Sequence, residues 1–515
     1  MLALLFLGAH FLASRNCFCY SSVNKPLSGK FFGVHAMTEN VASITQLPDS
    51  PNTHDDAHVK EIENVKQTLD EYFATGATES LSWRKRQLSA FLKLLKAEEQ
   101  AISEALHQDL HKSGEEAYIT EIGYLVKDVK HLLNNLEKWM KPSSKSTPML
   151  AMPAKSYTRP EPLGTCLVIG AWNYPFQLTL SPMLAAISAG NCVIVKPSEL
   201  APATSALIAQ LLPKYLDMNA IGVVEGGKEP TSALLKLPFD KIFYTGGEHV
   251  GKIVMEAAAK HLTPVTLELG GKSPCIIDKD IDLETALSRM VWGKLMNAGQ
   301  TCIAPDYLLV HHSNLDNVVA ALKKVILAQY KKDPKTNRFY GRIVNQRHCA
   351  RLVSYLENQN VIHGGEHDIE DKYLAPTIVL NPSLDSPLMQ EEIFGPIIPI
   401  ISMSGRSDML QFIRSRPKPL AAYVFTEDKE FEQKCVQRIS AGSMCINDTS
   451  MFMLNPELPF GGVGTSGMGQ YHGKYGFDTF SHQKSVLRRS FSMENSMRYM
   501  PLNSFKMWVL KRFIK

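Results

Sequence analysis

Three residues far apart in the chain carry side chains suited to covalent acyl chemistry: Cys302, Asn173 and Glu268. Cys302 stands among small and polar neighbours at residues 297–305, a setting that suits a reactive thiol better than a packed core. In acyl chemistry a thiolate attacks a carbonyl carbon, amide donors hold the oxyanion, and a carboxylate activates water. The three residue types together indicate a site that could form and cleave an acyl-cysteine.

Each of these residues also has a purely structural interpretation. A cysteine is most often a small buried hydrophobe, an Asn before a Tyr-Pro pair is typical of a turn, and a strand-end glutamate often faces solvent. Glu268, however, follows an apolar run and precedes Gly270 and Gly271. This position indicates a partly desolvated carboxylate with a raised pKa, as a base that works near neutrality needs.

Five segments, in order along the chain, resemble the aldehyde dehydrogenase superfamily: residues 170–175, 196–199, 266–274, 297–305 and 391–396. Two longer passages, residues 244–280 and 459–482, are most similar to the class 3 branch and within it to the fatty aldehyde dehydrogenases, and the likeness covers roughly residues 59–484.

The resemblance implies a role for each of the three reactive residues. Cys302 would be the nucleophile, and Asn173 would hold the oxyanion together with the main-chain amide of Cys302. Glu268 would be the base that activates water to cleave a thioester. The charge of an oxidised nicotinamide, or nearby amide donors, would have to stabilise the Cys302 thiolate.

A turn that follows a predicted strand and opens a helix is the expected pyrophosphate site, because main-chain amides and the helix dipole favour an anion there. Its residues are Gly246, Gly247, Glu248, His249, Val250 and Gly251. The resemblance implies that Gly246 and Gly251 are its paired glycines. Gly247, Glu248 and His249 stand where the class is expected to have Asn, Thr and Ala, which places an acid near the phosphates.

Five further residues complete the expected cofactor site. Lys196 and Glu199 follow a strand, where an adenosine ribose would lie, and Glu199 would repel a 2′-phosphate. This favours NAD, although the resemblance to class 3 implies that NADP is tolerated. Glu392 and Phe394 resemble the family residues that hold the nicotinamide ribose and pack on the ring, and Trp172 would shape the pocket.

Short apolar strands alternate with helices around these motifs, which predicts parallel sheets covered on both faces. In the first lobe we expect strands at residues 166–169, 191–195, 221–225, 241–244 and 265–268, and helices at 182–189, 203–216, 230–237 and 251–260. With the resemblance, the predicted fold is α/β and aldehyde dehydrogenase-like. It has two doubly wound parallel-sheet lobes, a Rossmann-like cofactor lobe and a catalytic lobe, plus an oligomerisation arm.

The predicted organisation has five parts. They are residues 1–58, a leader that is targeting or disordered; 59–269, an NAD(P)-binding domain with an extended arm at about 143–162; 270–446, a catalytic domain; 447–490, a glycine-rich connector and oligomerisation segment; and 491–515, a basic amphipathic tail. The resemblance implies that the arm pairs two subunits into a homodimer.

Composition limits the classes of function. A chain of 515 residues is long enough for more than one core. A formal net charge of +4, with basic and acidic residues interspersed, argues against nucleic-acid binding. The nine cysteines are an odd number without a paired CxxC arrangement, so we expect free thiols in a reducing compartment and no metal site.

Both ends of the chain bear on localisation. The apolar run at residues 1–13 is shorter than the roughly 20 residues of a membrane-spanning helix. It could be a signal-type segment, part of a transit sequence, or a poorly ordered leader with Met37 as an alternative start. Residues 501–515 fit a cationic helix at a membrane surface, or one packed on its own enzyme. We expect the cytoplasm or a cytosol-facing membrane such as the endoplasmic reticulum, with the mitochondrion as the alternative.

The leading hypothesis is NAD(P)-dependent oxidation of medium- to long-chain (fatty) or aromatic aldehydes to carboxylic acids through a Cys302 thioester. One alternative is a cofactor-independent thiol esterase or acyl transferase that uses Cys302 and Glu268. Another is a scaffold protein that has lost cofactor binding, for which residues 247–249 are the only hint. The turn at residues 246–251 distinguishes them, because a pure hydrolase does not require it.

Overall fold

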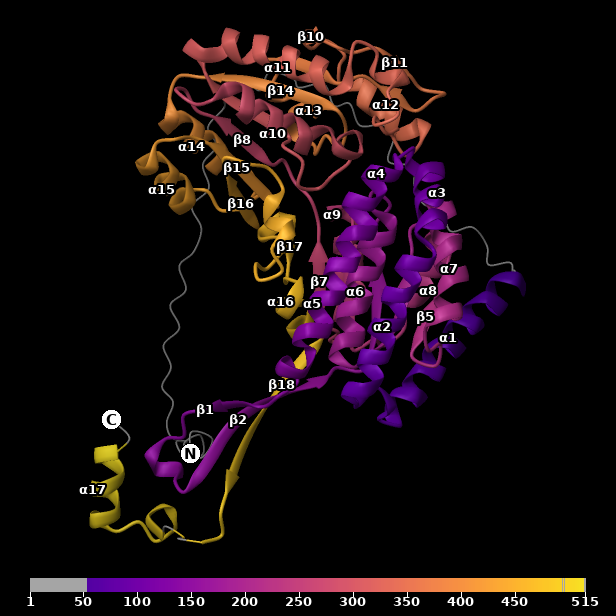
Figure 1. The fold of residues 1–515 in the computed structure, drawn as a ribbon. Helices are drawn as coiled ribbons and strands as arrows, with labels where there is room; N and C mark the ends of the chain where they lie inside the picture. Colours follow the sequence, from indigo (N-terminus) through magenta and orange to yellow (C-terminus); the bar gives the residue numbers. More distant parts are fainter. Residues whose placement is uncertain (1–52, 493, 495, 514–515) are drawn as a thin grey trace, which may run out of the picture. The chain divides into compact units, whose positions relative to one another are not determined.

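The computed structural model describes residues 53–492, 494 and 496–513 (Figure 1). Residues 1–52 of the expected leader, with the apolar run and Met37, lie outside the described residues. Helix α1 (Thr53–Ala74) begins inside residues 1–58, the stretch that was assigned to the leader. No helix in the described part of the chain has the length and apolar character to cross a membrane.

The first sheet carries the motifs before residue 270. Among the described residues it has six strands, in the order β17-β7-β6-β3-β4-β5. They are β3 (Thr165–Ile169), β4 (Cys192–Lys196), β5 (Ile221–Val223), β6 (Lys241–Thr245), β7 (Val265–Glu268) and β17 (Gly467–Met468). All pair in parallel except β17, which is antiparallel to β7. Strands β3, β4 and β6 are buried along their whole length, as expected for parallel strands covered on both faces.

Helices cover this sheet and pack on one another. They are α1, α2 (Leu81–Ala97), α3 (Glu99–Leu110), α4 (Gly114–Ala117), α5 (Gly123–Trp139), α6 (Pro175–Ala189), α7 (Pro202–Tyr215), α8 (Lys228–Leu235) and α9 (Glu248–Ala259). Helices α2, α5 and α6 contact one another, as do α3 and α7 (Figure 1). Helix α6 begins at Pro175, not at residue 182 as expected, because a proline is well suited to a first turn and Pro182 is accommodated inside the helix.

The second sheet carries the region after residue 270. In the described chain its seven strands lie in the order β10-β13-β14-β9-β8-β15-β16. They are β8 (Pro274–Ile277), β9 (Tyr307–His311), β10 (Val361–His363), β13 (Thr377–Leu380), β14 (Ile397–Met403), β15 (Ala421–Phe425) and β16 (Ser443–Ile446), and the small pair β11 (His367–Asp368) and β12 (Tyr373–Leu374) lies apart. Its helices are α10 (Leu283–Leu295), α11 (Leu315–Tyr330), α12 (Gln346–Ser354), α13 (Pro387–Gln390), α14 (Arg406–Arg414) and α15 (Lys429–Arg438).

A third, antiparallel sheet forms the arm. It joins β1 (Ser143–Lys145), β2 (Ala154–Pro162) and β18 (Ser481–Arg489), and β2 pairs with β18 over its whole length. The segment expected as one connector, residues 447–490, is therefore divided: β17 joins the first sheet, α16 (Gly473–Thr479) packs on α6, and β18 joins the arm. Helix α17 (Ser504–Phe513) lies in the tail. The predicted α/β fold with parallel-sheet lobes is confirmed.

Candidate active site

Cys302 follows a tight turn between α10 and β9. Asn297, Ala298 and Gly299 take successive positive φ angles of 53°, 52° and 78°. A Cβ on Gly299 would come within 2.3 Å of the main-chain oxygen of Gly395. Left-handed backbone at a non-glycine residue costs roughly 1–2 kcal/mol, so the surrounding structure must hold this turn in place.

Buried side-chain amides supply that hold. The Asn297 amide donates to the carbonyls of Asn173 at 2.7 Å and Gln300 at 3.1 Å. The Gln300 amide donates to the carbonyls of Asn297 at 3.0 Å and Arg342 at 2.9 Å, and its oxygen accepts from the Val344 amide at 2.9 Å. The turn before Cys302 is thus bonded directly to the segment that carries Asn173.

Asn173 lies just before α6 and is 3% exposed. Its side-chain nitrogen donates to the carbonyl of Gln300, two residues before Cys302, at 3.1 Å. A carboxamide has two N–H donors, so the second remains to meet a ligand. This position suits the oxyanion role that the sequence indicates.

Glu268 ends β7, in register with Thr245 of β6 on one side and Gly467 of β17 on the other. Its side chain is 2% exposed, and neither carboxylate oxygen has a hydrogen-bond partner among the described residues. Burial raises the pKa of Glu268 well above its usual range, as expected from its position at a strand end. A buried carboxyl without a partner is costly, and such groups are typical of functional sites.

The Cys302 thiol is half-buried, whereas most of the other described cysteines are fully buried. Burial, together with the charges of Glu392 and Glu268, raises the pKa of Cys302 to about 12. Main-chain hydrogen bonds from Cys302 and Ile303 lower this pKa without outweighing those effects. The thiol is therefore mainly protonated at neutral pH in spite of these donors, and a positive charge beside the sulfur would favour the thiolate.

Aromatic residues surround these groups. Tyr471 is 1% exposed, interacts electrostatically with Glu268 and Cys302, and has a hydroxyl without a partner within the described chain. The Tyr174 hydroxyl lies 2.6 Å from the Thr301 hydroxyl. Tyr471 was not among the residues predicted for the site, because it follows a glycine-rich stretch in which nothing distinguishes it from a core aromatic residue.

The expected pyrophosphate turn joins β6 to α9. Gly247 is the N-cap of α9, and residues 247–250 are all exposed, so the free main-chain amides of the first turn face outward. A Cβ on Gly247 would meet nothing within 4 Å, whereas one on Gly246 would come within 2.3 Å of the Tyr244 hydroxyl. The Glu248 carboxylate is paired with Lys252 at 2.7 Å, which offsets its charge. Open backbone at a helix N-terminus fits a phosphate.

Lys196 and Glu199 lie at the end of β4, two strands from β6 in the same parallel sheet. The buried Lys196 ammonium donates to the exposed Glu199 carboxylate at 2.8 Å. Burial tends to raise the pKa of Glu199, but the bonds from Lys196 and the main chain lower it overall, so this carboxylate is ionised at neutral pH. An anionic acceptor at this edge fits ribose hydroxyls.

Glu392, Phe394 and Trp172 lie on the catalytic side of the expected cofactor site. The rings of Trp172 and Phe394 meet edge to face at 5.2 Å. A Cβ on Gly270 would come within 2.3 Å of a Glu392 carboxylate oxygen, so the two segments touch. Burial and the charge of Asp306 raise the pKa of Glu392 to about 8.

The site residues predicted from the sequence thus fall into two linked groups. Cys302, Glu268 and Glu392 interact electrostatically, and Asn173 is bonded to the Cys302 turn. The turn at residues 246–251 and the Lys196–Glu199 pair lie at the carboxyl ends of β6 and β4, where parallel sheets bind ligands. A thiol, a desolvated carboxyl and an amide donor beside a dinucleotide-type edge can carry out acyl chemistry with hydride transfer.

Comparison with known proteins agrees with this chemistry. A family model described as the aldehyde dehydrogenase family matches residues 51–486. The chain is 46% identical over 446 residues to the 4,4'-diaponeurosporen-aldehyde dehydrogenase of Staphylococcus aureus, covering 86% of this chain and 97% of that one. It is 46% identical over 461 residues to aldehyde dehydrogenase family 3 member A2 of Rattus norvegicus, with coverage of 88% and 95%. It is equally 46% identical over 442 residues to the dimeric NADP-preferring aldehyde dehydrogenase of Rattus norvegicus, with coverage of 85% and 98%.

Solved structures share the fold. The substrate-bound AldH of Staphylococcus aureus superposes with a TM-score of 0.86 at 45% identity, covering 88% of this chain and 99% of that one. An aldehyde dehydrogenase of Mycobacterium tuberculosis in complex with NAD+ superposes with a TM-score of 0.77 at 27% identity, covering 85% and 92%. The chain therefore belongs to the aldehyde dehydrogenase family, in its class 3 branch, and is an oxidoreductase.

Proposed function

We propose that this enzyme oxidises medium- to long-chain (fatty) or aromatic aldehydes to carboxylic acids with NAD, through a thioester on Cys302. The observation that supports it most is the buried carboxyl of Glu268, which has no hydrogen-bond partner among the described residues and interacts electrostatically with the half-buried Cys302. When such a carboxyl is ionised it can take a proton from water, and the neutral form that results is the one that burial favours.

The chain's own residues divide the work in two stages. The Cys302 sulfur bonds to the aldehyde carbon, and the free N–H of Asn173 and the main-chain amide of Cys302 hold the resulting oxyanion. NAD, when bound, would supply the acceptor for the hydride that leaves that carbon. A Glu268 carboxylate oxygen then removes a proton from water, the resulting hydroxide attacks the thioester carbon, and the bond from that carbon to sulfur breaks. The carboxylic acid leaves, and the Cys302 sulfur takes the proton back from Glu268.

The residues suited to hold NAD are those at the carboxyl ends of the first sheet, with Glu392, Phe394 and Trp172 at the nicotinamide end. The ionised Glu199 favours a ribose with free hydroxyls over a 2′-phosphate. The partner of Glu199, Lys196, offers a cation next to it, so NADP would be tolerated at lower affinity. The NAD+ complex of one relative and the NADP preference in another's name are both compatible with this.

An apolar aldehyde is supported by the residues next to Asn173. A small buried apolar cluster lies where the chain enters α6. It consists of Ala171 and Tyr174 before the helix and Leu178 in its first turn. An aldehyde whose chain or ring packs beside these side chains would gain about 0.8 kcal/mol for each methylene that it buries. A relative named for 4,4'-diaponeurosporen aldehyde also supports an apolar substrate.

We propose a homodimer paired through the arm. In the part of the chain that the structure describes, β18 is one edge of the arm sheet and β16 is one edge of the second sheet. Edge strands offer unpaired main-chain groups to another chain. Leu487 on β18 is 55% exposed, which suits an interface. The name of one relative also describes that protein as dimeric.

We further propose that the tail binds membrane surfaces peripherally, at a cytosol-facing membrane such as the endoplasmic reticulum or within the cytoplasm. Phe505 and Trp508 on α17 are 64% and 62% exposed, and their rings lie 6.3 Å apart. Lys511 and Arg512 occupy the last turn of this helix. Exposed aromatic residues beside cations are typical of interfacial helices.

The experiment that tests the function supplies purified enzyme with NAD and either decanal, benzaldehyde or acetaldehyde, and records reduced nicotinamide by absorbance. Decanal or benzaldehyde should give a kcat/KM at least about tenfold above acetaldehyde, as a few buried methylene groups predict. A flat trace with all three aldehydes, or cleavage of an ester with no aldehyde oxidation, would refute the proposal.

A further inference from the structure

We propose that Lys112 and Glu121 are positioning residues, a buried ion pair that fixes the main chain of Asn173 and so aims its carboxamide at the oxyanion. The inference rests on the role of Asn173 proposed above.

Lys112 bonds directly to the segment that carries the oxyanion donor. Its side chain and that of Glu121 are both 0% exposed, and the ammonium lies 2.5 Å from a Glu121 carboxylate oxygen. The same ammonium donates to the main-chain carbonyl of Asn173 at 3.0 Å and lies 4.1 Å from the centre of the Tyr174 ring. Burying two charges costs more than an apolar pair would, so their presence calls for a role beyond stability.

Glu121 holds the other side of the same segment. Its second carboxylate oxygen accepts from the main-chain amides of Phe176 at 2.9 Å and Gln177 at 3.1 Å, in the first turn of α6. Tyr174 at the N-cap position caps none of these amides with its own side chain in the described structure, so a carboxylate from another helix does so. The ion pair therefore makes hydrogen bonds to the main chain on both sides of Tyr174.

Further hydrogen bonds connect this ion pair to the turn that precedes Cys302. The Asn173 carbonyl that accepts from Lys112 also accepts from the Asn297 side chain at 2.7 Å. The main-chain amide of Asn297 in turn donates to a Glu116 carboxylate oxygen at 2.6 Å. The oxyanion donor and the nucleophile turn are thus fixed to one frame.

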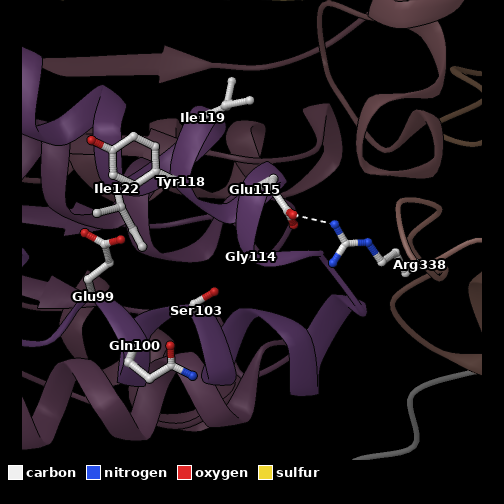
Figure 2. A pocket seen from close by; sticks show the side chains of 9 residues that line it. All are labelled: Glu99, Gln100, Ser103, Gly114, Glu115, Tyr118, Ile119, Ile122 and Arg338. Carbon is white, nitrogen blue, oxygen red and sulfur yellow. Dashed lines mark hydrogen bonds and ion pairs between the residues drawn. The ribbon is translucent and has the colours of Figure 1, made fainter.

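Glu116 and Glu121 come from one short stretch, α4 and the π-helix Tyr118–Ile122 that follows it. π-Helical turns are rare and often occur at functional sites. The outer face of this stretch lines a groove of about 650 Å³, and Figure 2 shows Glu115 pointing across it to Arg338. That exposed ion pair, at 2.7 Å, involves the same stretch without reaching the catalytic segment, so it provides a matched control.

The test uses neutral residues of similar shape in the full-length enzyme. Lys112→Met/Glu121→Gln removes both charges of the pair, so that neither partner is left without the other. Asn173→Ala removes the oxyanion donor, and a third variant combines all three changes. Glu115→Gln/Arg338→Gln is the control. Stopped-flow absorbance with decanal and NAD gives the rate of the first turnover, steady-state assays give KM for NAD, and thermal unfolding checks folding.

Asn173→Ala should slow the first turnover by about a hundred- to a thousandfold. Lys112→Met/Glu121→Gln should slow it by at least about tenfold with KM for NAD unchanged, and the combined variant should be no slower than Asn173→Ala, because residues that act as a unit are not additive. A normal rate in the paired variant, or multiplied losses in the combined one, overturns the inference. A normal rate in Asn173→Ala instead refutes the oxyanion role itself.

A milder variant covers failure of the paired variant to fold. Glu121→Asp keeps both charges and withdraws the carboxylate by one methylene from Phe176 and Gln177. It should slow the first turnover by several-fold without changing KM for NAD, whereas an unchanged rate would contradict the positioning role. The control variant should match the wild type, and a loss there equal to that of the paired variant would also overturn it.

Discussion

Thr245 and Glu268 lie opposite each other in the parallel register of β6 and β7, and both carry buried oxygens without a hydrogen-bond partner in the described chain. Two strand ends therefore present unsatisfied polar atoms at one place in an otherwise paired sheet. Such atoms are uncommon in folded proteins and cost free energy unless a ligand or water meets them. The arrangement would suit a water molecule at the ends of β6 and β7, next to the proposed base Glu268.

Glu268→Gln should separate the two stages of the reaction. The amide cannot take a proton from water, so thioester cleavage should slow by about a hundred- to ten-thousandfold, the usual contribution of a general base. Formation of the thioester should continue, giving a burst of reduced nicotinamide close to one per active site, followed by a slow steady state. Steady turnover at the wild-type rate would remove Glu268 as the base.

Local patterns in the sequence were enough to locate five of the six strands described in the first sheet, because short apolar runs such as residues 242–244 are typical of buried parallel strands. The sixth strand, β17, was expected to lie in the glycine-rich connector. The catalytic trio needed the family resemblance, since Asn173 alone is typical of a turn. The buried ion pair that contacts Asn173 could not be predicted from the sequence. Lys112 and Glu121 are nine residues apart and would be assigned to a solvated surface, and only tertiary packing buries them beside residue 173.

The pH dependence of stability should reflect Glu392. Its pKa is raised to about 8 in the folded protein from an ordinary 4.5, so folding favours its protonated form. The unfolded state therefore binds fewer protons between these two pKa values. The contribution of Glu392 to the free energy of unfolding is fully present below pH 4.5 and is lost as the pH rises to about 8. Calorimetry of the enzyme without NAD at pH 5, 6.5 and 8 should show a Tm that falls less in Glu392→Gln than in the wild type. Parallel curves for the two proteins would contradict the raised pKa.

The Cys302 thiol should react slowly before cofactor binds. Because its pKa is raised to about 12, iodoacetamide should modify it slowly at pH 7.5, and the rate should rise steadily up to pH 10. Saturating NAD should accelerate the modification, since the positive ring stabilises the thiolate. Mass spectrometry of the peptide that contains Cys302 measures this, with the half-buried Cys445 as an internal control. Fast, pH-independent alkylation without NAD would be inconsistent with the structure.

Adjacent glycines in the cofactor turn should respond differently to the same change. Gly246→Ala places a methyl group within 2.3 Å of the Tyr244 hydroxyl, so the enzyme should lose about 1–3 kcal/mol of stability. Gly247→Ala meets no atom within 4 Å and should fold like the wild type. If phosphate approaches the open backbone there, KM for NAD should rise in Gly247→Ala all the same. Denaturant unfolding and steady-state kinetics measure the two effects, and a stable Gly246→Ala would show that the turn is looser than described.

The most direct test of a thioester on Cys302 is to trap the acyl group on the enzyme. Glu268→Gln is mixed with decanal and NAD, quenched in acid within seconds, digested and examined by mass spectrometry. If Cys302 is the nucleophile, the peptide that contains it should carry one decanoyl group, matched by one reduced nicotinamide, and neither product should form in Cys302→Ala. Reduced nicotinamide without an acyl group on Cys302, or an acyl group on another residue, would contradict it.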